Sequence, residues 1–372
     1  MLTLEEVKSQ AQLKAFVKFP FSLYDDSSPW VPPIISQEMK GFDTKENPVF
    51  EYAEANLFVA KRDGKIVGRI AAIINWLEVK KMGLKKMRFG WFDFIDDKEV
   101  SKILLDKVAE IGRSNDLEFM EGPVGFSNLD KVGVVTEGFE VIGSMITWYN
   151  HPYYKSHYEA YDMEIEKGYY EAQFPFTAVD PTPFRRMQGI IRKRYNLKPV
   201  NFTTTKEIMP YVDEMFDLFN TTYARLSSFV EITDRQKAYF KKKFIPFVNP
   251  EYIKFVLDKD DKMIGFAIVL PSFAKALKKA KGKLFPFGFF HLLKAKKNSD
   301  AVAFYLIGIL PEYQNKGVTA IIFNEFYNVF INSPVKTFYR TPELDENTAI
   351  HQLWKNFDPV ITRRRKTYKK LL

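Results

Sequence analysis

A stretch near the carboxyl-terminal end of the chain combines the residue types that build an anion-binding turn. Residues 306–310 read Leu-Ile-Gly-Ile-Leu and are followed by Pro311, which predicts a buried strand that stops where proline cannot donate a ladder hydrogen bond. A polar turn centred on Gly317 follows, and then a helix whose apolar residues recur every three or four positions. The first amides of such a helix have no partner inside it and carry partial positive charge, so a pyrophosphate would fit there.

The turn resembles the acyl-CoA-binding loop of the acetyl-CoA-dependent N-acyltransferase superfamily, abbreviated GNAT, which reads Gln-x-x-Gly-x-Gly or Ala after a strand ending in Pro. The loop residues here are Gln314, Asn315, Lys316, Gly317, Val318 and Thr319. The sequence departs from the family pattern at Thr319, whose side chain crowds the turn and adds a hydroxyl group at the helix start. The alternative is an ordinary strand-loop-helix connection, because a single glycine motif is weak evidence.

The resemblance implies particular contacts with a CoA co-substrate. The amides of Gln314 to Thr319 would bind its pyrophosphate, and Lys316 would add positive charge. Ile309 and Leu310 would offer backbone groups to the pantetheine arm. The donor implied is acetyl-CoA or another acyl-CoA.

Two residues after the turn are candidates for catalysis under the same resemblance. Glu343 follows an expected strand that would separate from its neighbour to admit the thioester, and it could act as the base for the attacking amine; the alternative is a surface loop carboxylate. Asn347 begins the next expected helix, where it could contact the pantetheine or the leaving sulfur, or serve only as the N-cap. Many family members carry on this helix a Tyr that acts as the general acid toward the CoA thiolate. The aligned position here holds Trp354, which cannot donate a proton usefully, so the sequence identifies no general acid.

The composition of the chain limits the classes of protein to which it can belong. The chain has 372 residues, 46% of them hydrophobic and 35 of them Phe, which predicts two globular domains with large cores. It has no Cys, which excludes disulfides, thiolate nucleophiles and Cys-ligated zinc. No apolar run is long enough to span a bilayer and the amino-terminal residues include acids, so we expect a cytoplasmic protein without a transmembrane segment.

Other catalytic motifs are absent from the sequence. The four His residues do not occur at a recognised metal-ligand spacing, so no metal is expected. No Ser-His-Asp pattern and no phosphate-binding glycine motif of the nucleotide-binding folds appears, so hydrolase and nucleotide-binding functions have no support. The four are His151, His157, His291 and His351.

The element order expected from the sequence occurs twice. A hairpin around Asp63-Gly64, a strand and a helix in the first half parallel a hairpin, strand, turn and helix in the second. We therefore predict an α/β protein of two tandem GNAT-like units with mixed sheets, covering 1–175 and 176–372, that arose by divergent duplication. The segments FPFSLYDDSSPWVPPI, NPVFEYAEANLFVAKRDGKIVGRIAAIIN, GPVGFSNLDKVGVVTEGFE and YNHPYY resemble those of a group of bacterial tandem-GNAT proteins, a resemblance that implies the fold but no acceptor.

The first unit lacks the residues of the anion-binding turn. Its equivalent helix begins with Asp96, Asp97 and Glu99, and the glycine turn is missing. Acids at a helix start satisfy its dipole and repel an anion. We therefore expect this unit to bind no CoA and to act as a scaffold or help bind the acceptor.

The basic charge is concentrated in one segment. The net charge is +9, and residues 273–299 contain eight Lys, no acid and a Phe-rich centre. Such a segment could contact an anionic lipid surface or acceptor, or bind RNA through phosphates and stacked bases. The third possibility is a solvated Lys-rich loop whose phenylalanines fill the core.

These features favour an N-acyltransferase that passes an acyl group from acyl-CoA, acetyl-CoA being expected, directly to a small-molecule or peptide amine. The intact spacing from Gln314 to Gly317 supports the enzyme. The alternative is a non-catalytic GNAT pair that binds RNA, anionic lipid or a protein partner, which Trp354 and Thr319 favour.

Overall fold

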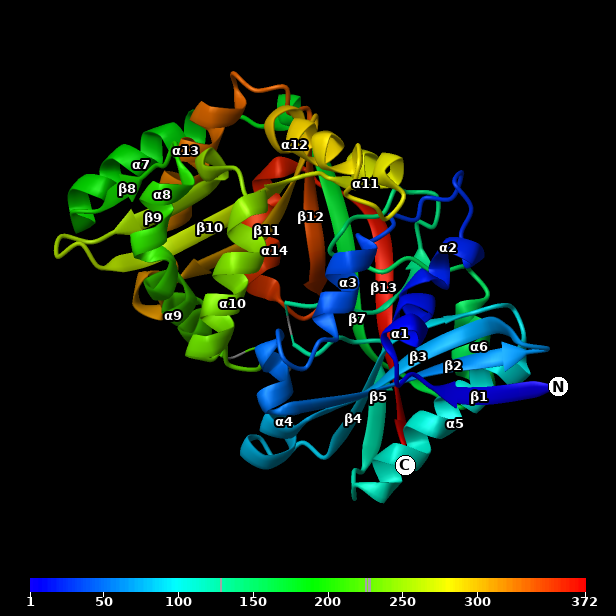
Figure 1. Ribbon diagram of the computed structural model, residues 1–372. Helices are drawn as coiled ribbons and strands as arrows, with labels where there is room; N and C mark the ends of the chain where they lie inside the picture. The colour runs from blue at the N-terminus through cyan, green and yellow to red at the C-terminus, as the bar shows by residue number, and fades with distance from the viewer. Residues whose placement is uncertain (128, 225, 227–228) are drawn as a thin grey trace. The chain divides into compact units, whose positions relative to one another are not determined.

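The computed structural model describes residues 1–127, 129–224, 226 and 229–372. Its internal contacts divide the chain into two compact α/β units (Figure 1). The first unit comprises Met1–Tyr170, Ala274–His291 and Thr362–Leu372, and the second comprises Glu171–Phe273 and Leu292–Ile361. The prediction of an α/β protein with mixed sheets is confirmed.

The first unit is built on a mixed sheet with helices on both faces. The strands lie in the order β1 (Leu2–Glu6), β2 (Ala53–Arg62), β3 (Lys65–Asn75), β4 (Lys86–Phe94), β5 (Phe119–Gly122) and β13 (Val360–Leu371), with β6 (Val134–Glu137) also pairing with β13. The helices are α1 (Gln10–Lys18), α2 (Pro20–Leu23), α3 (Ile35–Gly41), α4 (Trp76–Lys81), α5 (Lys98–Ser114), α6 (Tyr154–Ala160) and α11 (Ala274–Ala280). Strand β7 (Glu164–Pro175) carries the chain into the second unit.

Local sequence explains the central elements of this unit. Asp63 and Gly64 both adopt positive φ, 49° and 79°, which is the backbone that a two-residue hairpin turn requires. Helix α5 buries Val100, Leu104 and Val108 against one face of the sheet. The other face is covered by α1 and α3.

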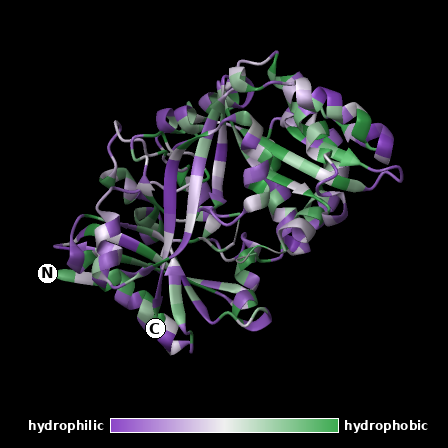
Figure 2. Ribbon diagram, turned by 180° about the vertical axis from the view of Figure 1, so that it is seen from behind, coloured by the Kyte–Doolittle hydropathy of each residue, from purple (hydrophilic) through white to green (hydrophobic). Residues whose placement is uncertain are grey.

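The second unit repeats this plan. Its strands lie in the order β12 (Thr337–Leu344), β11 (Ala301–Ile309), β10 (Met263–Pro271), β9 (Ile253–Leu257) and β8 (Lys198–Val200). Only β11 and β12 are parallel among these neighbours, and Figure 2 shows β9 and β10 largely in the colour of hydrophobic residues. The helices are α7 (Thr182–Tyr195), α8 (Thr205–Ile208), α9 (Val212–Tyr223), α10 (Asp234–Phe244), α12 (Gly288–Asn298), α13 (Val318–Phe330) and α14 (Thr348–Trp354).

The helices position the turn that the sequence singled out. Helix α13 lies beside α7 and packs on β8, β9 and β10, whereas α9 packs on β10 and β11. The expected strand, turn and helix around Gly317 are present as β11, a short 3-10 turn at Pro311–Tyr313 and α13. The turn therefore joins a central strand of the sheet to a helix on one of its faces.

The observed units differ from the predicted 1–175 and 176–372 in two segments and in the boundary, which lies between Tyr170 and Glu171. Residues 274–291 and 362–372 pack with the first unit. Strand β13 is hydrophilic in sequence, yet Arg363 and Arg365 are buried because both donate to loop carbonyls between Gly133 and Val141. No local pattern in the sequence specifies which sheet such a strand joins.

Candidate functional site

The turn at the end of β11 has the backbone conformation of an anion-binding loop. Asn315 and Gly317 adopt left-handed φ values of 61° and 78°, and Gly317 is the N-cap of α13. No side chain caps the helix, and its first turn contains no acid. Among the backbone hydrogen bonds of the described residues, none is donated by the amides of Gly317, Val318 or Thr319. Those amides are therefore available to an anion.

A basic helix that the sequence did not predict lies against this turn. A Cβ atom on Gly317 would come within 2.4 Å of Ile191 Cδ1 in α7. The amine of Lys316 lies 5.3 Å from the ring centre of Tyr195 and 4.9 Å from that of Tyr313. The last turn of α7 adds three exposed cations, Arg192, Lys193 and Arg194. Positive charge therefore surrounds the open amides.

Strands β11 and β12 separate before β11 reaches this turn. Strands β11 and β12 are in register from Ala301↔Thr337 to Phe304↔Arg340, and the described residues show no further pair between them. The register of β11 against β10 also shifts between Phe304 and Leu306, which is the extra residue of a β-bulge and bends the strand. Beyond this point the side chains of β11 and β12 are mostly half-buried rather than buried. Side chains of both strands are thus partly accessible in the segments where the pairing has ended.

The backbone groups expected to contact pantetheine are already engaged. Gln314 donates from Nε2 to the Ile309 carbonyl at 3.0 Å. The Leu310 amide donates to the Ile264 carbonyl of β10 at 2.9 Å. The Ile309 carbonyl has a second lone pair, so a ligand could bind it beside the exposed side chain of Gln314 or displace that side chain. The Leu310 amide, in contrast, is used within the sheet.

Glu343 lies where the strands separate and is not a surface loop carboxylate. Its side chain is only 10% exposed and is paired with Arg340, whose Nε lies 3.1 Å from Oε1. Trp354 donates its Nε1–H to the same oxygen at 2.9 Å. Burial raises the pKa of Glu343 above its usual value, although Arg340 and Trp354 oppose the shift. The result is an oriented carboxylate with increased basicity.

Tyr223 is a functional candidate that the sequence did not reveal. Its hydroxyl, at the end of α9, donates to the Ile307 carbonyl of β11 at 3.2 Å. Burial, with a contribution from the charge of Glu343, raises the pKa of Tyr223 to about 12. Asn347 in turn is the N-cap of α14, since its side chain accepts from the Ile350 amide at 3.3 Å.

Solved structures share this architecture. The tandem GNAT protein from the clavulanic acid biosynthesis pathway aligns over 100% of this chain and 98% of its own, with a TM-score of 0.58 and 10% identity. A GCN5-related N-acetyltransferase from Sphaerobacter thermophilus aligns over 100% and 95% of the two chains, with a TM-score of 0.52 and 8% identity. The chain has the tandem GNAT fold. The predicted fold is thereby confirmed.

Two bacterial proteins are similar to this tandem GNAT chain in sequence. Protein YghO of Escherichia coli (strain K12) is 27% identical over 314 residues, covering 83% of this chain and 79% of its own. The bacterial ceramide synthase of Caulobacter vibrioides is 25% identical over 323 residues, covering 84% and 82%. No family model matches the chain. Both similarities cover more of the chain than a single GNAT unit.

The first GNAT unit is closed at the equivalent positions. The Asp97 side chain caps α5 by accepting from the Glu99 amide at 2.9 Å, and it pairs with Arg62 at 2.8 Å. The Val124 amide donates to the Phe89 carbonyl at 2.8 Å, which ties the chain after β5 to β4 beyond their last register pair. The start of α5 is thus already occupied by the Asp97 carboxylate, and β4 and the chain after β5 remain hydrogen-bonded.

The structure does contain a Ser-His-Asp chain in this unit, contrary to the sequence-based expectation. His157 contacts the Ser101 hydroxyl through Nδ1 at 2.7 Å and the Asp96 carboxylate through Nε2 at 2.9 Å. Serine and histidine are both buried, and the exposed member is the aspartate. A nucleophile without access to substrate cannot act, so this chain of contacts joins α5 to α6 structurally.

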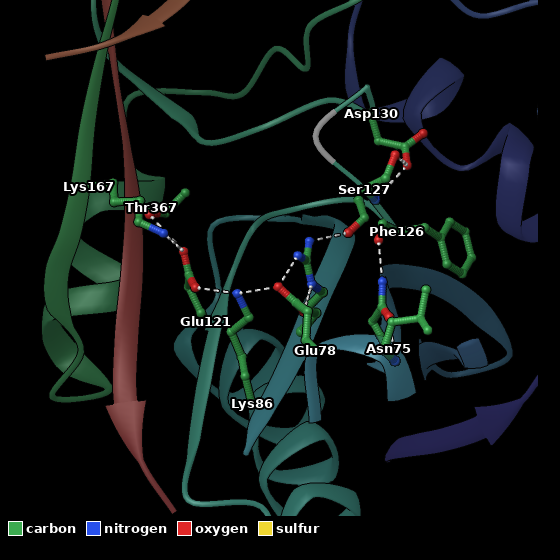
Figure 3. A network of polar contacts seen from close by, with 12 residues as sticks. Asn75, Glu78, Lys86, Glu121, Phe126, Ser127, Asp130, Lys167 and Thr367 are labelled. Atoms are coloured by element: carbon green, nitrogen blue, oxygen red, sulfur yellow. Dashed lines mark hydrogen bonds and ion pairs between the residues drawn. The ribbon is translucent and has the colours of Figure 1, made fainter. Parts of the chain in front are cut away.

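A buried network of charges occupies the first unit where β4 and β5 meet (Figure 3). Glu78 contacts both Arg88 and Lys86, at 2.5 Å and 3.0 Å. Lys86 also pairs with Glu121 at 3.1 Å, and Lys167 reaches the same carboxylate at 3.5 Å. Each of these charges has an opposite partner, so removal of one partner would leave an uncompensated buried charge.

In the described part of the chain, no three His, Asp or Glu side chains form a possible metal site. Of the helices that the structure describes, none has both the length and the hydropathy of a membrane span.

Proposed function

We propose that the second GNAT unit is an N-acyltransferase that binds an acyl-CoA at the turn 314–319 and transfers its acyl group to an amine. The observation that supports it most strongly is the occurrence of open α13 amides and separated strands at one end of β11. The amides and the cations of Lys316 and α7 suit the phosphates of CoA. The Ile309 carbonyl suits the pantetheine arm, either beside Gln314 or after Gln314 moves away.

The residues at the strand separation suit the two proton transfers of this reaction. A bond forms between the amine nitrogen and the acyl carbon, and the carbon–sulfur bond breaks. The nitrogen must lose a proton, which Glu343 can accept directly or through water because burial increases its basicity. The sulfur gains a proton, which Tyr223 can supply because it remains protonated at neutral pH. In this proposal Tyr223 is the general acid, a role that Trp354 cannot fill.

The Tyr223 assignment predicts a selective loss of turnover. We expect Tyr223→Phe to lower kcat by about tenfold or more, since one proton transfer loses its donor, with little change in acyl-CoA affinity. Steady-state release of CoA thiol and calorimetric binding measure the two quantities. Tyr195→Phe, which keeps a ring beside Lys316, is the control. A kcat equal to that of the wild type would remove Tyr223 from the mechanism.

The acceptor class that we propose is a long-chain amine. The Caulobacter relative is named a ceramide synthase, and a ceramide is the N-acyl derivative of a long-chain amino alcohol. Beyond the register shift, Ile307 and Ile309 lie on the same face of β11 and are half-buried, so their apolar side chains suit an alkyl chain. Assays should therefore compare sphinganine with short amines, each with acetyl-CoA and with palmitoyl-CoA.

The backbone conformation of the turn predicts that a substitution at Gly317 weakens acyl-CoA binding. Gly317→Val should weaken acyl-CoA binding at least about tenfold, because a β-branched residue strains the left-handed backbone by roughly 1–2 kcal/mol and its Cβ would contact Ile191. Gly189→Ala is the matched control, because a Cβ there meets nothing within 4 Å and alanine favours the helix. Calorimetry and thermal shift measure binding; a ligand at 100 times its Kd stabilises by about 2.7 kcal/mol.

The same titration tests the proposal itself. If neither acetyl-CoA nor palmitoyl-CoA stabilises the wild type, the enzyme is excluded and the non-catalytic GNAT pair is favoured. If both Gly variants bind as the wild type does, the cofactor binds elsewhere. Circular dichroism must first show that Gly317→Val is folded.

A further inference from the structure

Four phenylalanines near the start of α12 point into solvent. Their exposed fractions are 85% for Phe285, 69% for Phe287, 49% for Phe289 and 65% for Phe290. The possibility that these side chains fill the core is therefore wrong. Soluble proteins rarely expose a contiguous apolar cluster of this kind unless it binds something.

The exposed cluster is held in place at its base by the first unit. Residues 279–290, here named the Phe-Lys loop, run from the end of α11 into the start of α12 (Figure 1). The Gly282 carbonyl accepts from the Ile35 amide at 3.0 Å, and the amine of Lys281 pairs with Asp26. Within the loop the Phe289 amide donates to the Leu284 carbonyl at 2.7 Å. The phenylalanines are thus displayed by an anchored structure.

The charges around the cluster select an anionic partner. Lys279, Lys281 and Lys283 are exposed on the Phe-Lys loop, and the sequence from 273 to 299 contains no acid. A hydrophobic patch alone could bind many proteins. Exposed phenylalanines surrounded by lysines, however, match an anionic membrane, which has charged headgroups at its surface and acyl chains below them. Nucleic acid fits less well, because base stacking needs open ring faces and two of the four rings, Phe289 and Phe290, contact each other edge to face.

We propose that the Phe-Lys loop docks the protein on an anionic membrane, with phenylalanines at the boundary between headgroups and acyl chains and lysines on the phosphates. This docking does not depend on acyl transfer, and a catalytically dead chain would still show it. Docking would also bring the protein to the membrane in which a long-chain amine acceptor resides.

Vesicle flotation of the full chain tests the proposal. The probes are phosphatidylcholine vesicles with and without phosphatidylglycerol. We expect binding only to the anionic vesicles, weakened by salt. Each Lys near an anionic surface contributes about a fivefold factor in binding, so Lys279→Glu/Lys283→Glu should lose at least about 25-fold. Phe285→Ser/Phe287→Ser/Phe290→Ser should lose at least about tenfold, because buried apolar area drives insertion.

Matched controls separate docking from general charge attraction. Lys45 and Lys65 are also exposed in the first unit, and Lys45→Glu/Lys65→Glu changes the net charge by the same amount. Equal losses in the two Lys pairs would overturn the proposal, as would binding unaffected by the Phe changes. Binding of single-stranded RNA that the loop variants abolish, with no vesicle binding by the wild type, would assign the loop to nucleic acid instead.

Discussion

Glu343→Gln is expected to lower kcat by about 100-fold or more, with little change in acyl-CoA affinity, because the substitution removes the base and keeps the shape. The amide oxygen of the introduced glutamine can still accept from Trp354, but the buried Arg340 loses its charged partner. Circular dichroism and urea unfolding must therefore first show that the variant is folded. The comparison of CoA release rates with calorimetric affinities measures the effect. Glu346→Gln, which changes an exposed acid in the turn that follows β12, is the matched control.

The pH profile distinguishes a base from a merely structural carboxylate. Burial raises the pKa of Glu343 above its usual value of 4.5, so the wild-type kcat/KM should fall as the pH falls through that raised pKa. The kcat/KM of Glu343→Gln should not show this decrease at low pH. If Glu343→Gln has a low kcat but its kcat/KM still decreases at low pH, Glu343 acts only by neutralising Arg340. If its kcat equals that of the wild type, Glu343 has no catalytic role.

The parts of the site that the sequence predicted are local in the chain. The strand, turn and helix around Gly317 depend on Pro311, on a left-handed glycine and on an apolar stripe, all within 25 residues of one another. The capping role of Asn347 likewise depends on the residue type at a helix start. Neighbours in sequence determine these features, so a pattern of residue types is sufficient to predict them.

The parts that the sequence did not predict depend on tertiary structure. Tyr223 contacts Ile307, 84 residues away, and no periodicity reports that pairing. The phenylalanines of the Phe-Lys loop look like core residues by type, but the anchoring of Gly282 beside Ile35 holds them in solvent. The position of strand β13 in the sequence suggests the second unit, whereas hydrogen bonds to β5 and β6 decide its place.

Loss of one carboxylate from the buried network should destabilise the first unit strongly. Glu78 is fully buried and accepts from Arg88 Nε at 2.6 Å as well as from its terminal nitrogen. Glu78→Gln leaves Arg88 and Lys86 buried with too little negative charge, which costs about 3–5 kcal/mol. Urea unfolding at neutral pH measures the change. Glu118→Gln removes an exposed partner of Lys85 and should cost under about 1 kcal/mol.

The acid dependence of stability provides a second measurement of the same carboxylate. Burial alone would raise the pKa of Glu78, but the charges and hydrogen bonds of Arg88 and Lys86 outweigh it and lower the pKa to about 2. The unfolded chain, with a pKa of 4.5, therefore binds the proton first as the pH falls. The stabilisation, about 3 kcal/mol, is present above pH 4.5 and is lost as the pH falls toward 2. Glu78→Gln should remove this contribution to the acid slope; an unchanged slope would contradict it.

The position of this network explains why the two GNAT units differ. The last register pair between β4 and β5 is Arg88↔Glu121, and the corresponding last pair in the second unit is Phe304↔Arg340. In the first unit the charges at this position neutralise one another in the interior, and the chain beyond them remains hydrogen-bonded. In the second unit Arg340 orients Glu343 beside parted strands. If Glu78→Gln destabilises the fold as expected while acyl-CoA affinity persists in the folded protein, the first unit supports the structure and the second unit binds the cofactor.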